Sequence, residues 1–357
     1  MKRSTFRWWR IVPIAGLLVL GLCGWSCAVD EGDEPASSVE LEWKPSSGDY
    51  LGQEPPGTEP RLFAPGLVST GLSERDMAIS PDGNALYFTT VLGSSYTFSA
   101  IVELRRSQGS WKGPQVVSFS GHYMDLEPAL TQDGEQMFFV SRRPAQEGGE
   151  PSDNEDIWVV DRVEEGWGVP RNLGAPINTS RPEFFPSVTR EGTLYFTRKG
   201  EDGTESIYRS RISHEEYMEP EILGPEVNSA RTRFNAFIAP DESYLIVCFW
   251  GAEDGLGGSD YYVVFRSPDD VWSEPVNLGA KINTADGQEW SPYVSPDGRY
   301  FFFMASRPSI ERRYSPEGLS YEDIQRLHDQ PMNGNFDIWW VDAGFIEELR
   351  PAISQDD

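Results

Sequence analysis

Acidic residues recur at one place in several repeated stretches of this chain, just before an apolar run that leads into a tight turn. The residues at this place are Glu74, Asp125, Glu183 and Glu289, with Arg233 in one copy. Asp76 and Glu127 add a second acid two residues later. Carboxylates that converge on one point could bind a cation, a basic peptide or a sugar, and a pair of carboxylates is the machinery of glycoside hydrolysis.

Arginines that end the second apolar run offer these acids partners. Glu289 and Arg307 stand at equal distances from Gly298, so an antiparallel hairpin would place them opposite each other, within reach of an ion pair. The same symmetry pairs Asp125 with Arg142 and Glu183 with Arg198. We favour such structural ion pairs over a ligand site, since ion pairs of this kind are common. The candidate binding face comprises Glu74, Asp76, Asp125, Glu127, Glu183, Arg233, Asn235, Glu289, Arg142, Arg198 and Arg307.

The repeated stretch has the form EWSPYVSPDGRYFFFMASR, residues 289–307, and it occurs five times. Its turn acids are spaced by 51, 58, 50 and 56 residues, and they are Asp82, Asp133, Glu191, Asp241 and Asp297. A period near fifty is typical of propeller blades or solenoids. Asp-Gly turns between runs of Tyr, Phe, Ile and Val predict β-hairpins, and the pattern contains no solenoid helices.

Each copy continues into two further predicted strands. Third strands have the form DIWVVDR, residues 156–162, and fourth strands follow a tryptophan, as in WGVPRNLG, residues 167–174. Four strands per copy predict an all-β fold, a β-propeller of five four-stranded blades, while six blades would require an undetected copy. The last copy lacks a fourth strand that residues 63–71 match in outline, so we predict that an N-terminal strand closes the ring.

The phrases SPDG, DIW and W-x-x-P-x-N-L-G-x-x-I-N resemble the WD40-like propeller repeat of the TolB family and of many bacterial envelope lipoproteins. The resemblance covers residues 61–351. It implies a propeller in an envelope protein, but propellers host enzymes, binding platforms and scaffolds alike. It is confined to the propeller and implies no role in the Tol system.

The N-terminal residues have the layout of an export signal. A basic segment, residues 1–10, precedes an apolar run, residues 11–22, and the following GWSC resembles a lipoprotein processing box. We expect a lipid on Cys27 and, because Ala28 follows it, delivery to the outer membrane; an uncleaved anchor and ordinary signal-peptide cleavage are the alternatives. The expected regions are a signal peptide (1–26), a disordered acidic tether (27–60), the propeller (61–351) and a C-terminal tail (352–357).

The sequence does not indicate metal, disulfide or nucleic-acid chemistry. Its three cysteines and three histidines are scattered, Cys248 falls in an apolar run, and no zinc, phosphate-binding or catalytic motif occurs. We therefore predict no metal and no cofactor, and surface positions for the histidines. The net charge of −27 at pH 7 would repel nucleic acid. The recurrent tryptophans, which we expect to pack between blades rather than to bind sugars, are Trp158, Trp167, Trp272 and Trp339.

The least repetitive segments, residues 143–155, 251–259 and 308–336, lie between second and third strands, on the face where the opening acids lie. Ser320 is placed to cap a short helix in the last of them. Insertions on one face of a repeat ring usually build its binding surface. We therefore predict a non-catalytic envelope lipoprotein whose propeller face binds an envelope protein or a cell-wall glycan. The alternatives are a carbohydrate-active hydrolase or lyase that uses carboxylates at the propeller axis, and a structural envelope scaffold.

Overall fold

The computed structural model describes residues 47–93, 96–145, 148–285, 287–307 and 318–351. The chain divides into residues 1–40 and 41–357, and every described residue belongs to the second unit. The predicted signal peptide, Cys27 and most of the predicted tether lie outside the described residues. None of the helices formed by the described residues has the length and apolar character needed to cross a membrane.

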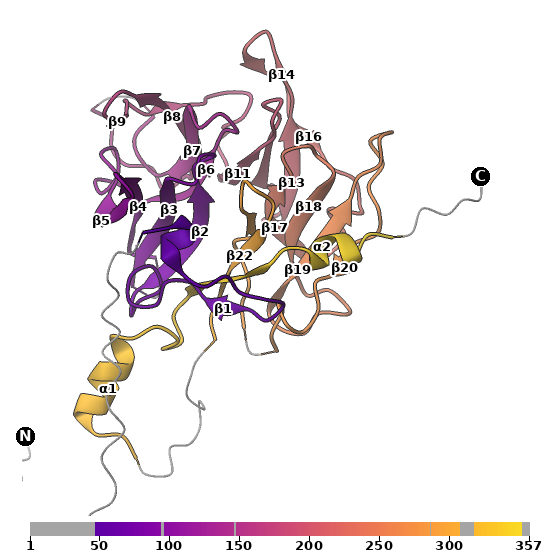
Figure 1. The fold of residues 1–357 in the computed structure, drawn as a ribbon. Coiled ribbons are helices and arrows are strands. Elements are labelled where there is room, and N and C mark those ends of the chain that lie inside the picture. Colours follow the sequence, from indigo (N-terminus) through magenta and orange to yellow (C-terminus); the bar gives the residue numbers. More distant parts are fainter. Residues whose placement is uncertain (1–46, 94–95, 146–147, 286, 308–317, 352–357) are drawn as a thin grey trace, which may run out of the picture. The chain divides into compact units, whose positions relative to one another are not determined.

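Five antiparallel sheets with four main strands each form the second unit, which confirms the predicted all-β propeller (Figure 1). The first two blades are β2 (Ser73–Ile79), β3 (Ala85–Leu92), β4 (Phe98–Ser107) and β5 (Ser110–Val116), then β6 (Asp125–Leu130), β7 (Gln136–Ser141), β8 (Asp156–Val163) and β10 (Arg171–Asn172), with β9 (Gly166–Trp167) paired to β8. The third and fourth are β11 (Glu183–Val188), β12 (Leu194–Lys199), β13 (Glu205–Ser210) and β16 (Glu221–Ile222), then β17 (Thr232–Ile238), β18 (Tyr244–Trp250), β19 (Ser259–Phe265) and β20 (Val276–Asn277). The fifth is β21 (Tyr293–Val294), β22 (Tyr300–Ala305), β23 (Asp337–Asp342) and β1 (Arg61–Leu62).

Shorter elements decorate the blades. A small hairpin, β14 (Ile212–Ser213) with β15 (Glu216–Tyr217), extends from the third blade (Figure 1). The described residues outside the sheets include the 3-10 turn η1 (Asp49–Gly52) and the helices α1 (Tyr321–His328) and α2 (Phe345–Glu348). Ser320 accepts a hydrogen bond from the backbone N–H of Asp323, so the predicted cap of α1 is confirmed.

The last blade is closed from the N-terminal side of the propeller. β1 pairs antiparallel with β23 and places Leu62 opposite Trp339. Figure 1 draws these two strands in indigo and yellow. Phe63 N then donates a hydrogen bond to Ile338 O at 2.9 Å. This pairing confirms the predicted closure. The predicted strand at 63–71 is placed two residues too late, because that segment mostly forms turns.

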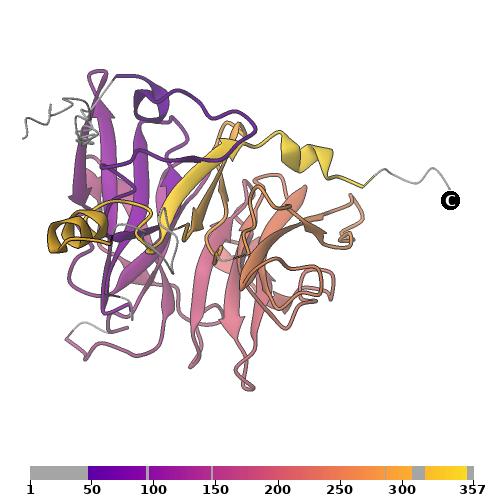
Figure 2. The ribbon, with the colours of Figure 1, turned by 90° about the horizontal axis from the view of Figure 1, so that it is seen from below.

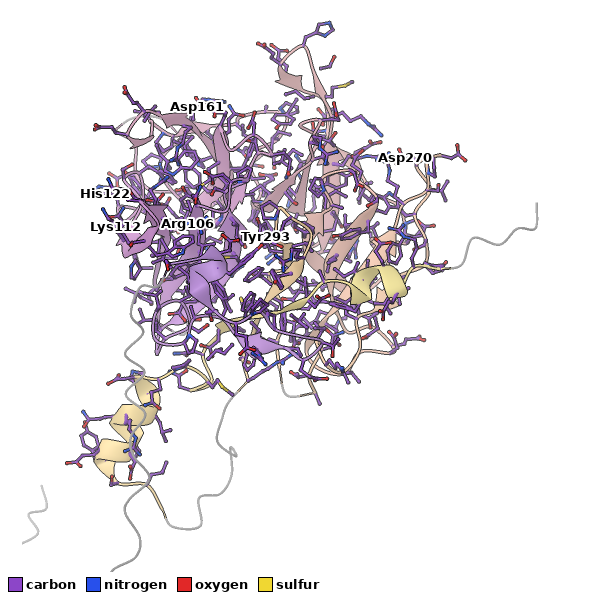
Figure 3. The ribbon with its side chains drawn as sticks, viewed as in Figure 1. Arg106, Lys112, His122, Asp161, Asp270 and Tyr293 are labelled. Atoms are coloured by element: carbon purple, nitrogen blue, oxygen red, sulfur yellow. The ribbon has the colours of Figure 1, made fainter. Side chains whose placement is uncertain are left out.

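Side chains join the last blade to the first at the closing junction. Tyr293, labelled in Figure 3, accepts a hydrogen bond through its hydroxyl from Ile79 N of β2 at 3.0 Å. Phe63 packs edge-to-face on Trp340 with ring centroids 5.2 Å apart, and both belong to a core cluster that includes Phe88 of β3. The closing junction is therefore packed as a continuous apolar core. Figure 2 shows the yellow strand of the last blade beside the strands of the first blade.

The hairpin turns form through local hydrogen bonds that their sequences predict. In the first copy Ser80 Oγ donates to Asp82 Oδ1 at 2.6 Å and accepts from Ala85 N at 2.8 Å. Gly83 has a φ of 66°, a left-handed conformation that glycine adopts at little cost. The equivalent bond from Ser295 to Asp297 is also 2.6 Å long. Short-range chemistry is therefore sufficient to place these turns.

The recurrent tryptophans are buried between blades, as predicted. Each is at most 8% exposed, and they are Trp158, Trp167, Trp272 and Trp339. Trp167 of the second blade shares a core cluster with Tyr87 of the first. Trp158 and Trp339 also cover guanidinium groups, with Arg143 and Arg307 lying 5.3 Å and 4.9 Å from the ring centroids. These tryptophans stabilise the ring and are not available to a ligand.

The remaining sequence predictions for cysteine and histidine also hold. Cys248 is 0% exposed within β18 and behaves as a small buried hydrophobe. His122, His214 and His328 are exposed. No group of three His, Cys, Asp or Glu side chains suited to a metal ion occurs within the described ranges.

Candidate functional site

The opening acids of the repeats are buried at the corners between blades. We call these residues the corner acids; they are Glu74, Asp125, Glu183 and Glu289. Each is at most 1% exposed. Each accepts a hydrogen bond from a hydroxyl of the preceding turn, namely from Thr70, Ser120, Thr179 and Thr284 respectively. Burying a carboxylate is costly unless such donors are present. The corner acids therefore do not form the open ring of carboxylates considered from the sequence.

The third blade shows the predicted ion pair. β11 and β12 place Glu183 opposite Arg198, and Arg198 Nε donates to Glu183 Oε1 at 2.9 Å. Thr179 donates to the same carboxylate through its hydroxyl at 2.6 Å and its backbone N–H at 3.0 Å. Arg198 also donates to the carbonyl oxygen of Ile177 at 2.8 Å. Both carboxylate oxygens of Glu183 therefore have donors within the protein.

The predicted pairing of Asp125 with Arg142 is wrong. Arg143 is the partner, and its guanidinium lies 2.7 Å from Asp125 Oδ1. Arg142 instead pairs with Glu155 at 2.7 Å. Successive side chains of an extended strand point to opposite sides. Arg143 therefore lies at the corner with Asp125, whereas Arg142 lies on the side of the propeller axis.

The predicted ion pair of Glu289 with Arg307 is also wrong. Glu289 lies opposite Ala305, two residues before Arg307, because the strands do not pair symmetrically about Gly298. Arg307 donates to Ile282 O at 2.6 Å. Glu289 Oε2 and Arg307 Nε are buried without a hydrogen-bond partner among the described residues. Burial raises the pKa of Glu289 to about 7.

Glu74 lies at the closing junction opposite Thr90, where the third blade has Arg198. Thr70 donates to it through its hydroxyl at 2.5 Å and its backbone N–H at 3.1 Å. A second acid, Asp337, is 1% exposed, and its Oδ1 has no hydrogen-bond partner in the described part of the chain. Burial raises the pKa of Glu74 to about 8, with the charge of Asp337 adding to the rise, and raises the pKa of Asp337 to about 7.

Arg233 takes the place of the corner acid in the fourth blade. It donates to Ser206 Oγ at 2.8 Å and to Asn228 Oδ1 at 3.2 Å. Burial lowers its pKa. Neutral oxygen atoms thus satisfy a cation at a position where the other blades carry a carboxylate.

The hydroxyl donors at the corners were not identified from the sequence. The signal was present, because Thr70, Thr179 and Thr284 end the similar triplets VST, INT and INT. The middle residue also recurs in function: Asn178 Nδ2 donates to Ile157 O at 2.8 Å, and Ser69 Oγ donates to Ile338 O at 3.1 Å. These triplets tie each fourth strand to the third strand and to the next corner acid.

A β-bulge after each corner places three of the predicted site residues at the propeller axis. The strand register shifts in β2, β6, β11 and β17. Asp76, Glu127 and Asn235 lie in these bulges with φ of 60°, 58° and 50°. Such left-handed backbone is uncommon outside glycine, and bulges redirect side chains. All three residues are at most 4% exposed.

Arg75, which the sequence did not single out, joins two of these acids. It donates to Asp76 Oδ1 and Glu127 Oε1, both at 2.7 Å. Asp76 Oδ2 accepts from Glu127 N at 3.2 Å, and Glu127 Oε2 accepts from Phe185 N at 2.7 Å. Burial raises the pKa of Glu127 to about 8, although Arg75 opposes the rise. All four carboxylate oxygens therefore already have donors from the protein.

A pocket of about 630 Å³ opens beside this charged cluster, and we call it the axial pocket. Its aromatic lining comprises Tyr96, Phe184, Phe234, Trp250 and Trp290. Trp290 contacts the most partners, with ring centroids 6.5 Å from Tyr96, 6.1 Å from Phe234 and 5.1 Å from Phe336. A concave, aromatic pocket with a few polar groups is the usual form of a ligand site.

Charged side chains of both signs line the axial pocket in equal number, namely Arg75, Arg142, Arg231, Glu127, Glu155 and Glu205. Two ion pairs, Arg75 with Glu127 and Arg142 with Glu155, have N–O distances of 2.7 Å. Burial raises the pKa of Glu205, whose side chain has no hydrogen bond or ion pair to another described residue. The lining is therefore charged but balanced.

Three polar atoms in the lining have no hydrogen-bond partner within the described ranges. They are Asn235 Oδ1, Arg142 Nε and Trp290 Nε1, and all three are buried. Native proteins leave few buried polar atoms unsatisfied. These three atoms are enclosed by neighbouring protein atoms and do not lie on the surface of the pocket.

The non-repetitive segments predicted as a binding surface border this pocket. Glu155 ends the first segment, Trp250 precedes the second, and Phe336, which ends the third, packs on Trp290. The third segment is anchored at its C-terminal end, because Asn333 and Asn335 both donate to Gly71 O at 3.0 Å. Residues 308–317 of this segment lie outside the described residues.

Comparison with known proteins identifies no family. None of the protein-family models matches the chain, and no curated protein does. Similar solved structures include TolB from Acinetobacter baumannii (14% identity, 76% of this chain and 57% of that chain, TM-score 0.41) and a putative TolB from Agrobacterium tumefaciens (15%, 76% and 90%, 0.44). Another is an alpha-L-arabinofuranosidase from Lactobacillus brevis (12%, 76% and 92%, 0.45).

This chain thus spans little more than half the length of the first of these structures. At such low identities the likeness concerns the fold alone, and these neighbours differ in activity. The strand pairings themselves show the ring of five four-stranded blades, which is the fold that the resemblance to the TolB-type repeat implied.

Proposed function

We propose that this protein is a non-catalytic binding module of the bacterial envelope and that its axial pocket holds part of an envelope partner, a protein or a cell-wall glycan. The observation that carries this proposal is a concave aromatic pocket beside acids that already have donors. Asp76 and Glu127 accept donors at every carboxylate oxygen, whereas five aromatic side chains line the pocket.

The hydrolase alternative requires two available carboxyl groups, one to transfer a proton and one to act as nucleophile or base. Glu205 is available in the axial pocket, and its raised pKa suits proton transfer. The other acids of the lining, Glu127 and Glu155, are held by arginines. A single available acid supports binding better than hydrolysis.

The envelope location rests on the sequence. The basic segment, the apolar run and Cys27 support export and lipid attachment. Labelling with a fatty-acid analogue in a bacterial host tests this, and we expect Cys27→Ala to abolish both the label and membrane attachment. A labelled, membrane-bound Cys27→Ala protein would contradict the lipid anchor.

Site-specific photo-crosslinking in intact envelopes tests the binding function. A photoreactive amino acid replaces Trp250, which lines the pocket and is 38% exposed. The matched control carries it at Val169, which is 89% exposed and does not line the pocket. We expect a discrete product at Trp250 that is absent at Val169, identified by mass spectrometry. Identical products at both positions, or none at Trp250, would refute the proposal.

A further inference from the structure

The corner between the last blade and the first holds two buried acids without an arginine. Glu74 and Asp337 are each 1% exposed, and Glu74 N donates to Phe336 O at 2.9 Å, which brings the two acids together. Asp337 is the one charged group that acts on Glu74 among the described residues. Each of the other four corners contains a guanidinium group, from Arg143, Arg198, Arg233 or Arg307. The closing junction thus differs from every other corner in its charges.

Asp337 is held by the chain that precedes it. Met332 N donates to Asp337 Oδ2 at 2.8 Å, while Oδ1 has no hydrogen-bond partner within the described ranges. A buried oxygen without a donor is far more costly on a carboxylate than on a neutral carboxyl group. A proton on Asp337 would also give the pair of acids a hydrogen-bond donor. The surroundings therefore favour the protonated form.

Residues 329–336, which we call the latch segment, join α1 to β23 and lie against the closing junction. Asn333 and Asn335 each donate to Gly71 O at 3.0 Å, and a Cβ on Gly71 would lie only 2.7 Å from Asp329 Cα. α1 itself has no buried residue. The segment is thus held by a few neutral hydrogen bonds, which are individually weak. β2 and β23 are fixed in strand ladders, so the latch segment is the least strongly held part of this corner.

The surrounding elements supply no buried cation to this corner among the described residues. β3 and β22 present the uncharged Thr90 and Ala305 opposite the acids, and the turn at residues 69–72 has no charged residue. Arg75 of β2 is engaged by carboxylates at the propeller axis. Asp329 of the latch segment and His328 of α1 are exposed, where solvent screens their charges. Ionisation of both acids would therefore bury two like charges together.

We propose that Glu74 and Asp337 form a pH-sensitive latch, which holds residues 329–336 against the closing junction while at least one acid is protonated and releases them when both are ionised. The acids stay on their strands, and water reaches them where the latch segment leaves. α1 is then no longer held beside the blades. This inference does not depend on what the axial pocket binds.

Proton counts give the direction of the effect. Burial raises the pKa of Glu74 from 4.5 to about 8 and that of Asp337 from 3.8 to about 7. Release exposes both carboxyl groups to water and returns them toward their ordinary values, so the held state binds more protons in this range. Holding is therefore favoured at low pH and is lost as pH rises through about 7 and 8. Each extra proton of the held state changes the equilibrium about tenfold per pH unit.

Hydrogen exchange measured by mass spectrometry on the full chain in detergent tests the latch. Rates at pH 6 and pH 9 are divided by the intrinsic rate of an unstructured peptide at the same pH. We expect the protection of Met332 N to fall about tenfold or more from pH 6 to pH 9, while the amides of β18 stay protected at both values.

Asp337→Asn keeps an acceptor for Met332 N but cannot ionise, so we expect its latch segment to stay protected at pH 9. Asp342→Asn, at the exposed far end of the same strand, is the matched control and should release the segment as the parent does. Gly71→Ala places a Cβ against the backbone of Asp329 and should release the segment at both pH values, which gives the signal of full release. Circular dichroism establishes that the variants are folded, and Glu74→Gln replaces Asp337→Asn if the latter does not fold.

Three results would overturn the latch. The first is equal protection of Met332 N in the parent at the two pH values. The second is release of the segment at pH 9 in Asp337→Asn, or in the replacement variant, to the same extent as in the parent. The third is exchange of β18 together with the latch segment at pH 9, which would mean general unfolding instead of local release.

Discussion

Two corners of the propeller carry a glutamate at the same repeat position but differ in what surrounds it. Glu183 is held by Thr179 and by Arg198, which lies directly opposite in the hairpin. Glu74 is held by Thr70 in the same way, but it lies opposite Thr90 and near a second buried acid, Asp337.

The same residue type at the same repeat position can therefore differ in charge from one blade to another. Burial raises the pKa of Glu183 as well, but Arg198 at 2.9 Å opposes that rise, so removing the carboxylate would leave a buried cation. At the closing junction burial dominates and raises the pKa of Glu74 to about 8, so its neutral form prevails at pH 7. One corner is an ion pair, and the other is mostly a pair of neutral hydrogen-bonding groups.

The largest expected effect comes from removing the closing junction altogether. Deleting residues 61–70 removes β1, the buried Phe63 and Thr70, and so leaves both an open sheet edge and an unsatisfied Glu74. We expect loss of the cooperative thermal transition, measured by circular dichroism. Deletion of residues 28–46 is the control and should leave Tm unchanged. Equal Tm values for the two deletions would contradict closure by the N-terminal strand.

Glu183→Gln should be the most destabilising single substitution at the corners compared here. It leaves the guanidinium of Arg198 buried without its carboxylate, and breaking a buried pair in this way costs about 3–5 kcal/mol. Urea unfolding measures the change in free energy. Glu201→Gln in the same blade is the control, because the Glu201 side chain is 91% exposed and its ion pair with Arg181 should contribute less than about 1 kcal/mol. Similar losses for both variants would mean that Arg198 does not depend on Glu183.

Glu74→Gln should cost much less at pH 7, about 1 kcal/mol or less, since an amide replaces a carboxyl that is already mostly neutral and only one hydrogen bond is impaired. The same urea measurement compares it with Glu183→Gln. A loss as large as that of Glu183→Gln would show that Glu74 is ionised and that the two corners do not differ.

The pH dependence of stability gives the finest test of the comparison. Because the folded-state pKa of Glu74 is raised from 4.5 to about 8, the folded protein binds more protons than the unfolded chain between these values, and its contribution to stability falls as pH rises through this window. We expect Tm to be higher at pH 5.5 than at pH 8, and Glu74→Gln to reduce that difference. An unchanged difference in the variant would exclude Glu74 as its source.

Much of the fold was predictable from the sequence because the interactions that specify it are local. The turn of Ser80, Asp82 and Gly83 forms from neighbouring residues, and alternation of apolar side chains defines the two strands on either side. The ring closure was also predictable, since the missing fourth strand had one available match. Its position was two residues in error because strand ends carry little sequence signal.

The candidate site was predictable only in part. Asp76, Glu127 and Asn235 were named from repeat positions, but the partnership of Arg75 with two of these acids was not. Of the three arginine pairings, the structure shows only that of Glu183 with Arg198. The other two failed because the residues paired with Asp125 and Glu289 are Ser141 and Ala305, and the arginines come later in the strand.

The sequence by itself therefore determined the number of blades, their order and the residues that pack between them, since each blade repeats the same short-range pattern. The tertiary structure alone decided which polar atoms are satisfied. Asn235 Oδ1, Arg142 Nε and Trp290 Nε1 come from three different blades, and their lack of partners depends on how the bulges of distant strands converge on the axis. Whether a buried polar atom has a partner is a property of that convergence, and no local pattern encodes it.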